Sequence, residues 1–111
     1  MSLKRVAIAG AALLLATPLV TLADGDVAAG KTAGYTCLGC HGVKNYKNVY
    51  PTYHVPKICG QSAQYLLDAL NGYADGSRPH ETMHAQAATL SEADKQNIAA
   101  YFGDVAACGG K

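Results

Sequence analysis

The chain lacks the residue sets on which most enzymes depend. It has no Ser-His-Asp set, no pair of carboxylates at catalytic spacing and no phosphate-binding glycine loop, so we do not expect an independent catalytic site. It also lacks strand alternation, an internal repeat and a low-complexity tract. The 111 residues leave room for one domain at most, and the absences favour a compact helical one.

The chain also has little excess charge. Nine Lys and Arg residues stand against eight Asp and Glu residues, and two of the nine, Lys4 and Arg5, belong to an N-terminal segment that we expect to be removed. Binding to nucleic acid requires a basic patch, so this class of partner is not expected. The near balance also predicts little long-range electrostatic steering of a partner.

The first 23 residues predict a cleaved secretory signal peptide. The charged start is followed by an apolar run from Val6 to Val20 and by the small-residue sequence Thr21-Leu22-Ala23. The alternative is an uncleaved membrane anchor, but Gly10 and Pro18 interrupt a run that is already short for a span. We therefore expect cleavage after Ala23, a mature domain over residues 24–111, a periplasmic location and no stable membrane insertion.

One short motif carries the chemistry. Cys37-Leu38-Gly39-Cys40-His41 has the C-x-x-C-H form that is typical of covalent c-type haem attachment. Two thiols three residues apart can each bond one vinyl group of the porphyrin, and the next imidazole then lies under the iron. A zinc site would need a second close ligand pair, and a thioredoxin-like pair would need a βαβ pattern, neither of which is present.

Cys59 and Cys108 remain after the motif is assigned. In an exported protein they can pair, and the bridge would close a loop of about 50 residues, worth roughly 4 kcal/mol in the chain-entropy model. The alternative is two free buried thiols that behave as small hydrophobic residues.

Three helices are predicted. The first follows Asp24 and Asp26, either of which can cap it, and runs towards Cys37. The second begins at Ser62 and ends at Asp75-Gly76, and the third begins at Ser91. The third carries an apolar stripe of Ile98, Tyr101, Phe102 and Val105. Residues 43–56 and 76–89 show no long period and are expected to be loops.

Spacing alone does not identify the residue that binds the iron on the second face of the haem. Met83 is the only methionine outside the signal peptide, and a thioether ligand would raise the reduction potential of the iron. A lone methionine is otherwise a filler of core gaps. His54, His80 and His84 are alternative ligands, although histidines in polar loops usually face solvent.

The chain resembles the class I c-type cytochromes, in particular the small bacterial periplasmic monohaem carriers and single halves of their dihaem relatives. The resemblance covers essentially all of the mature chain and rests on Gly30-Lys31, Cys37 to Gly42, Pro56 to Gln61, Tyr65-Leu66, Gly76 to Arg78, Met83-His84, Leu90-Ser91 and Ala99 to Phe102. It implies an all-α fold of three main helices and loops around one covalent haem.

The resemblance also implies residue roles. His41 and Met83 would be the axial ligands of the iron, the Pro56 carbonyl would accept a hydrogen bond from the His41 ring, and Ile58 would pack against the haem. The chain departs from the family that it resembles at two positions. Gly34 stands where many carry an aromatic residue, and Cys59 stands where many carry alanine.

The expected function is one-electron transfer by a monomeric carrier, not an enzyme. Its partners would be redox proteins such as a periplasmic dehydrogenase, a cytochrome bc1-type complex or a terminal oxidase. Two alternatives remain: a fixed electron-transfer subunit of a dehydrogenase, and a gas sensor or peroxidase-like enzyme whose distal ligand is labile.

Overall fold

A computed structural model describes residues 25–109, and the predicted signal peptide lies outside them. Helix α1 (Val27–Ala33) begins at Asp26, whose carboxylate accepts a hydrogen bond of 2.8 Å from the Ala29 N–H. A 3-10 turn, η1 (Tyr35–Cys37), and the single-turn helix α2 (Leu38–His41) follow. The haem-attachment motif is therefore helical along its length.

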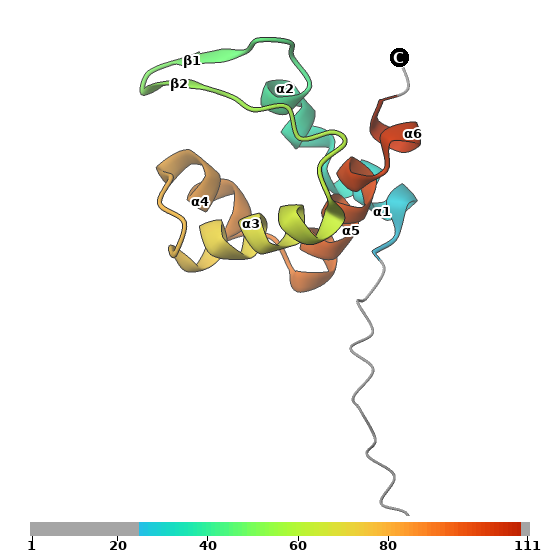
Figure 1. Ribbon diagram of the computed structural model, residues 1–111. Helices are drawn as coiled ribbons and strands as arrows, with labels where there is room; N and C mark the ends of the chain where they lie inside the picture. The colour runs from blue at the N-terminus through green and yellow to red at the C-terminus, as the bar shows by residue number, and fades with distance from the viewer. Residues whose placement is uncertain (1–24, 110–111) are drawn as a thin grey trace, which may run out of the picture.

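A small β-hairpin occupies part of the segment expected to be an irregular loop. Strands β1 (Lys47–Val49) and β2 (Thr52–His54) are antiparallel, with Asn48 opposite Tyr53. Each strand has three residues, which is too short to show the alternation that predicts a strand. In Figure 1 the hairpin and α2 lie on one side of the molecule, with α3 and α4 on the other.

Helix α3 (Ala63–Asp75) has the predicted bounds. The Ser62 hydroxyl accepts a hydrogen bond of 3.1 Å from the Tyr65 N–H, and the helix ends at Gly76 with φ of 83°. Helix α4 (Glu81–Ala87) lies where a loop was expected. The helix has only seven residues, and its N-cap is a histidine, which is not one of the usual capping residues. Neither feature predicts a helix from the sequence.

Helix α5 (Glu92–Gly103) also begins as predicted. The Ser91 hydroxyl accepts from the Asp94 N–H at 3.1 Å and donates to the Asp94 carboxylate at 2.8 Å. The predicted apolar stripe was too long, because α5 ends at Gly103 and Val105 is 62% exposed on the short helix α6 (Val105–Cys108). The Asp104 carboxylate caps α6 by accepting from the Ala106 N–H.

The core lies where α1 and α3 pack against α5. Its buried members are Leu66, Ile98, Ala99, Tyr101 and Phe102. Gly30 permits the contact with α1, because a Cβ atom at this position would lie 1.9 Å from the Asn97 carbonyl oxygen. A Cβ on Gly34 would lie 3.1 Å from the Phe102 ring, so this ring covers the position at which the family resemblance led us to expect an aromatic residue.

A disulfide between Cys59 and Cys108 joins the segment before α3 to α6. Nearby, the Gly60 N–H donates to the Phe102 carbonyl at 2.9 Å. No helix within residues 25–109 has the length and apolar character needed to cross a membrane. The predicted all-α class is confirmed, with the hairpin as a small addition.

Candidate haem site

Two cysteines of the motif are available for covalent attachment. Cys37 ends η1 and is half-buried, whereas Cys40 lies in α2 and is exposed. Neither forms a disulfide. Burial raises the pKa of the Cys37 thiol above its ordinary value, and hydrogen bonds within Cys37 and from Thr36 offset only part of this rise. The three-residue spacing on a helical segment places both sulfurs on one face.

The ring of the next residue, His41, is fixed by a hydrogen bond at one of its two nitrogen atoms. Its Nδ1 atom lies 2.6 Å from the carbonyl oxygen of Pro56. A carbonyl only accepts hydrogen bonds, so Nδ1 donates the proton, and in the neutral imidazole the free lone pair is then on Nε2. An imidazole fixed in this way presents Nε2 as a metal ligand.

Met83 lies in the first turn of α4 and is half-buried. Its backbone N–H donates a hydrogen bond of 3.2 Å to Nδ1 of His80, which is the N-cap of the helix. This cap fixes the first turn of α4, and the helix as a whole packs against α3.

The three other histidines occupy different surroundings. His80 packs edge to face against Tyr53, with ring centroids 4.7 Å apart, and against Tyr73 at 6.0 Å. His84 is exposed, and its Nδ1 lies 2.7 Å from the Tyr73 carbonyl oxygen. His54 is exposed in β2 opposite Lys47. His80 and His84 thus connect α4 to the hairpin and to α3.

These connections were missed by sequence reasoning. Tyr53 and Tyr73 are far from α4 along the chain, and no spacing rule relates them to His80 or His84. The only local signal was the presence of two histidines beside Met83, which we weighed as ligands rather than as anchors.

The chain also has a partly buried apolar surface. It adjoins the core cluster and contains side chains from α2, from the segment after the hairpin and from α3, together with the residue before α5: Leu38, Ile58, Leu67, Leu70 and Leu90. Ile58 lies between Pro56 and the disulfide-bonded Cys59, so its segment is tied at both ends. A flat apolar cofactor can cover such a surface and complete a small core.

The donor set fits a c-type haem. It comprises two thiols at the required spacing, an imidazole with Nε2 free of the Pro56 hydrogen bond, and a thioether on a helix that packs against α3. Cys37, Cys40 and His41 are brought together by the local helical structure. Met83 comes from a separate element, 42 positions after His41.

Comparison with known proteins places these residues in a family. No protein-family model matches the chain. Cytochrome c-554(548) of Halomonas halodenitrificans is 40% identical over 81 residues, which cover 70% of this chain and 94% of that protein. Cytochrome c4 of Pseudomonas aeruginosa is 38% identical over 92 residues, which cover 81% of this chain.

A third relative is more distant. The thiosulfate dehydrogenase electron acceptor of Thiomonas intermedia is 36% identical over 67 residues, or 60% of this chain. The chain spans less than half of the length of the cytochrome c4, 44%, and nearly all of the cytochrome c-554(548). With the helical fold and the C-x-x-C-H motif, these similarities support one conclusion: the chain belongs to the class I c-type cytochromes.

Proposed function

We propose that this chain is an exported one-electron carrier with a single covalently bound haem c. The observation that carries the proposal is the hydrogen bond between His41 Nδ1 and the Pro56 carbonyl, next to two unpaired thiols. It leaves the His41 Nε2 atom to bind iron. When bound, the haem supplies an iron that alternates between the ferrous and ferric states.

Each residue of the site has a proposed role. Cys37 and Cys40 form the thioether bonds, and His41 and Met83 are the axial ligands. Pro56 orients the imidazole, and Ile58 packs against the haem. A Met ligand raises the reduction potential compared with a second histidine. Ligands held by the protein in both oxidation states keep the geometric change on electron transfer small.

The proposed location is the periplasm, following cleavage of residues 1–23. The partners are other redox proteins. A second function is favoured by the names of two relatives, a thiosulfate dehydrogenase electron acceptor and the cytochrome subunit of a sulfide dehydrogenase of Chlorobaculum tepidum. In that case the chain would be the electron-transfer subunit of a periplasmic dehydrogenase.

The test uses protein co-expressed with a c-type haem maturation system. We expect one covalent haem per chain, a low-spin ferric spectrum with the weak red band of methionine sulfur bound to haem, and a reversible one-electron redox titration. A high-spin ferric spectrum would reject the carrier in favour of a sensor or enzyme. Stoichiometric co-purification with a dehydrogenase would favour the subunit function.

A further inference from the structure

Helix α4 has few attachments of its own around Met83. Its fully buried residue, Ala87, is the last of the helix, whereas Met83 lies in the first turn. The middle of the helix is tied to α3, because Nδ1 of His84 lies 2.7 Å from the Tyr73 carbonyl oxygen. A helix of seven residues is too short to be stable alone in water. The first turn, which carries Met83, therefore depends on contacts made by residues outside the helix.

The side chain of His80 makes the contact that holds this first turn. Its Nδ1 accepts the hydrogen bond from the Met83 N–H, so the direction of the imidazole decides whether the cap forms. The half-buried ring lies against two tyrosines, Tyr53 of the hairpin at 4.7 Å and Tyr73 of α3 at 6.0 Å between centroids. Both contacts are edge to face, with interplanar angles of 75° and 74°. The two rings thus favour the one orientation in which the imidazole caps the helix.

Tyr73 is fixed without help from the hairpin. The guanidinium carbon of Arg78 lies 4.9 Å from the ring centroid of Tyr73, and two guanidinium nitrogens donate to the Tyr65 hydroxyl at 3.2 Å. The Arg78 backbone N–H also donates to the Gly72 carbonyl at 2.9 Å. These residues all belong to α3 or to the segment directly after it. Tyr53 is therefore the part of the contact with His80 that comes from a distant segment.

The hairpin connects this contact to the residue that fixes the other proposed ligand. The Val55 N–H donates to the Tyr46 carbonyl at 3.0 Å, which extends the pairing of the two arms to the residue before Pro56. The Pro56 carbonyl oxygen lies 2.6 Å from Nδ1 of His41. Tyr53 and Pro56 are three positions apart on this paired arm. One short segment therefore contacts His41 at one end and the cap of α4 at the other.

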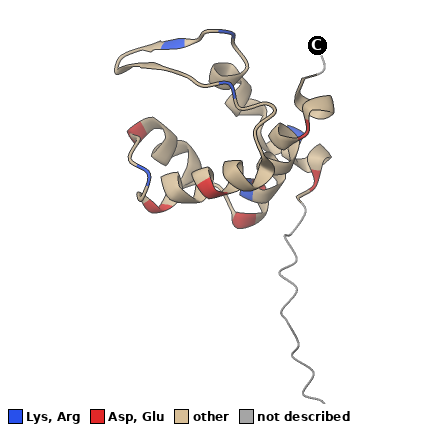
Figure 2. Cartoon of the chain, viewed as in Figure 1, with Lys and Arg blue, Asp and Glu red and all other residues tan. Residues whose placement is uncertain are grey.

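The contact between the hairpin and α4 is made by aromatic rings rather than by charges. Lys47 is exposed and pairs with His54, so both lie on the face of the hairpin opposite Tyr53. Figure 2 shows the two strands mostly tan, with blue on β1. In the part of the chain that the structure describes, the single salt bridge joins Lys95 to Glu92 within α5. The hairpin thus depends on the ring of Tyr53 for this attachment.

We propose that the hairpin is a strap that keeps the Met83 thioether on the haem iron, with Tyr53 as a positioning residue that acts through His80. This inference rests on the proposed function, in which Met83 is the distal ligand. Tyr53 fixes the imidazole, the imidazole caps α4, and the capped turn holds Met83 in place. Without the ring of Tyr53 the first turn opens more often, and Met83 leaves the iron more often.

The experiment titrates imidazole into the ferric, haem-loaded protein, because imidazole occupies the distal site only after Met83 has left the iron. The apparent affinity therefore rises with the fraction of molecules in which the first turn is open. We expect Tyr53→Leu to raise this affinity about fivefold, because the edge-to-face contact is lost. Tyr53→Phe keeps the ring and should stay within about twofold of the native protein. An unchanged affinity in Tyr53→Leu would overturn the proposal.

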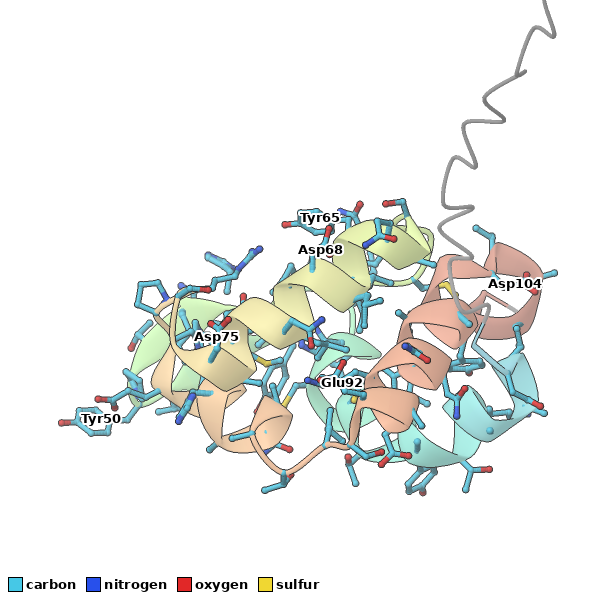
Figure 3. All side chains as sticks on the ribbon, turned by 90° about the horizontal axis from the view of Figure 1, so that it is seen from below. Tyr50, Tyr65, Asp68, Asp75, Glu92 and Asp104 are labelled. Atoms are coloured by element: carbon cyan, nitrogen blue, oxygen red, sulfur yellow. A yellow bond between two sulfur atoms is a disulfide. The ribbon has the colours of Figure 1, made fainter. Side chains whose placement is uncertain are left out.

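Two control variants separate the strap from general loosening of the fold. Tyr50→Leu makes the same substitution at the tip of the hairpin, where the side chain is 93% exposed and projects from one end of the molecule (Figure 3). Ile98→Val truncates a buried residue that faces Gly34 where α1 meets α5, so it lowers the overall stability. Both should change the imidazole affinity by less than about twofold. A fivefold rise in either would contradict the assignment to Tyr53.

A double variant tests whether Tyr53 acts through His80. His80→Asn keeps a side-chain oxygen that can cap α4, but it removes the ring that Tyr53 contacts. In this background Tyr53→Leu should change the imidazole affinity by less than about twofold. A fivefold effect there would show that Tyr53 acts by another route and would overturn the proposed role.

The red band of the ferric native protein distinguishes failure of the strap from failure of the proposed function. A native protein without this band would reject Met83 as the ligand, and the strap would be rejected with it. If the band is present but Tyr53→Leu leaves the imidazole affinity unchanged, the strap alone is rejected and the proposed ligand set stands.

Discussion

The ring of Tyr53 in β2 meets the imidazole of His80 edge to face, with centroids 4.7 Å apart. His80 is the N-cap of α4 and accepts a hydrogen bond from the N–H of Met83. Two residues after the end of β2, the Pro56 carbonyl oxygen lies 2.6 Å from Nδ1 of His41. The hairpin segment thus contacts both of the elements that carry the proposed axial ligands.

His80→Ala removes the acceptor that caps α4. We expect the free energy of unfolding of the haem-loaded protein to fall by about 1 kcal/mol, which is the usual cost of losing a side-chain cap. Guanidinium denaturation followed by circular dichroism measures the change. His80→Asn is the control, because an asparagine oxygen also caps a helix, and it should retain most of the stability. Unchanged stability in the alanine variant would show that the cap contributes nothing.

Met83→Ala tests the proposed distal ligand. Without the thioether, the reduction potential should fall, the red charge-transfer band should vanish and the ferric iron should bind added imidazole. Gln86→Ala, which truncates an exposed polar side chain of the same helix α4, is the control and should keep the band. A red band or an unaltered potential in the methionine variant would refute the ligand assignment.

The sequence predicted the elements that have strong local signals. Helices α3 and α5 begin at Ser62 and Ser91 because both hydroxyls cap the first turn, and α3 ends at the left-handed Gly76. The haem-attachment motif was also local. Shorter elements escaped detection, because the three-residue strands and the seven-residue α4 do not complete a recognisable period.

Contacts between segments that lie far apart along the chain could not be predicted from a single sequence. The pairing of Tyr53 with His80 depends on how the hairpin folds back over α4, and nothing in either segment encodes that distance. The neighbourhood of His41 and Pro56 was anticipated only through family resemblance.

The Cys59–Cys108 bridge closes a loop with a sequence separation of 49. Replacing both cysteines with serine should lower the free energy of unfolding by roughly 4 kcal/mol, because the unfolded chain regains the entropy of that loop. Denaturation of the oxidised haem-loaded protein, compared with the double variant, measures the loss. The reduction potential should stay unchanged, since the bridge lies outside the proposed ligand set. A loss below about 1 kcal/mol would exclude the loop-entropy account.

Gly30→Ala tests the crossing of α1 and α5. The added methyl group would lie 1.9 Å from the Asn97 carbonyl oxygen, so the two helices must separate. Overpacking of this kind costs about 1–3 kcal/mol, and thermal or denaturant unfolding should show it. Gly39→Ala is the matched control, because a Cβ atom at that exposed position meets no atom within 4 Å. Equal stability of the two variants would contradict the close crossing.

Asp75, the last residue of α3, makes the stability of the folded protein depend on pH. Hydrogen bonds from Ser77, first from its hydroxyl and then from its N–H at 2.8 Å, hold the pKa of the Asp75 carboxyl below its ordinary value. A lowered pKa in the folded state means that the contribution is present above the unfolded pKa and is lost as the pH falls through the folded pKa. Asp75→Asn should therefore be less stable than the native protein at neutral pH, and the difference should shrink on acidification. A difference that stays constant from neutral to acidic pH would show that the carboxylate charge is not its source.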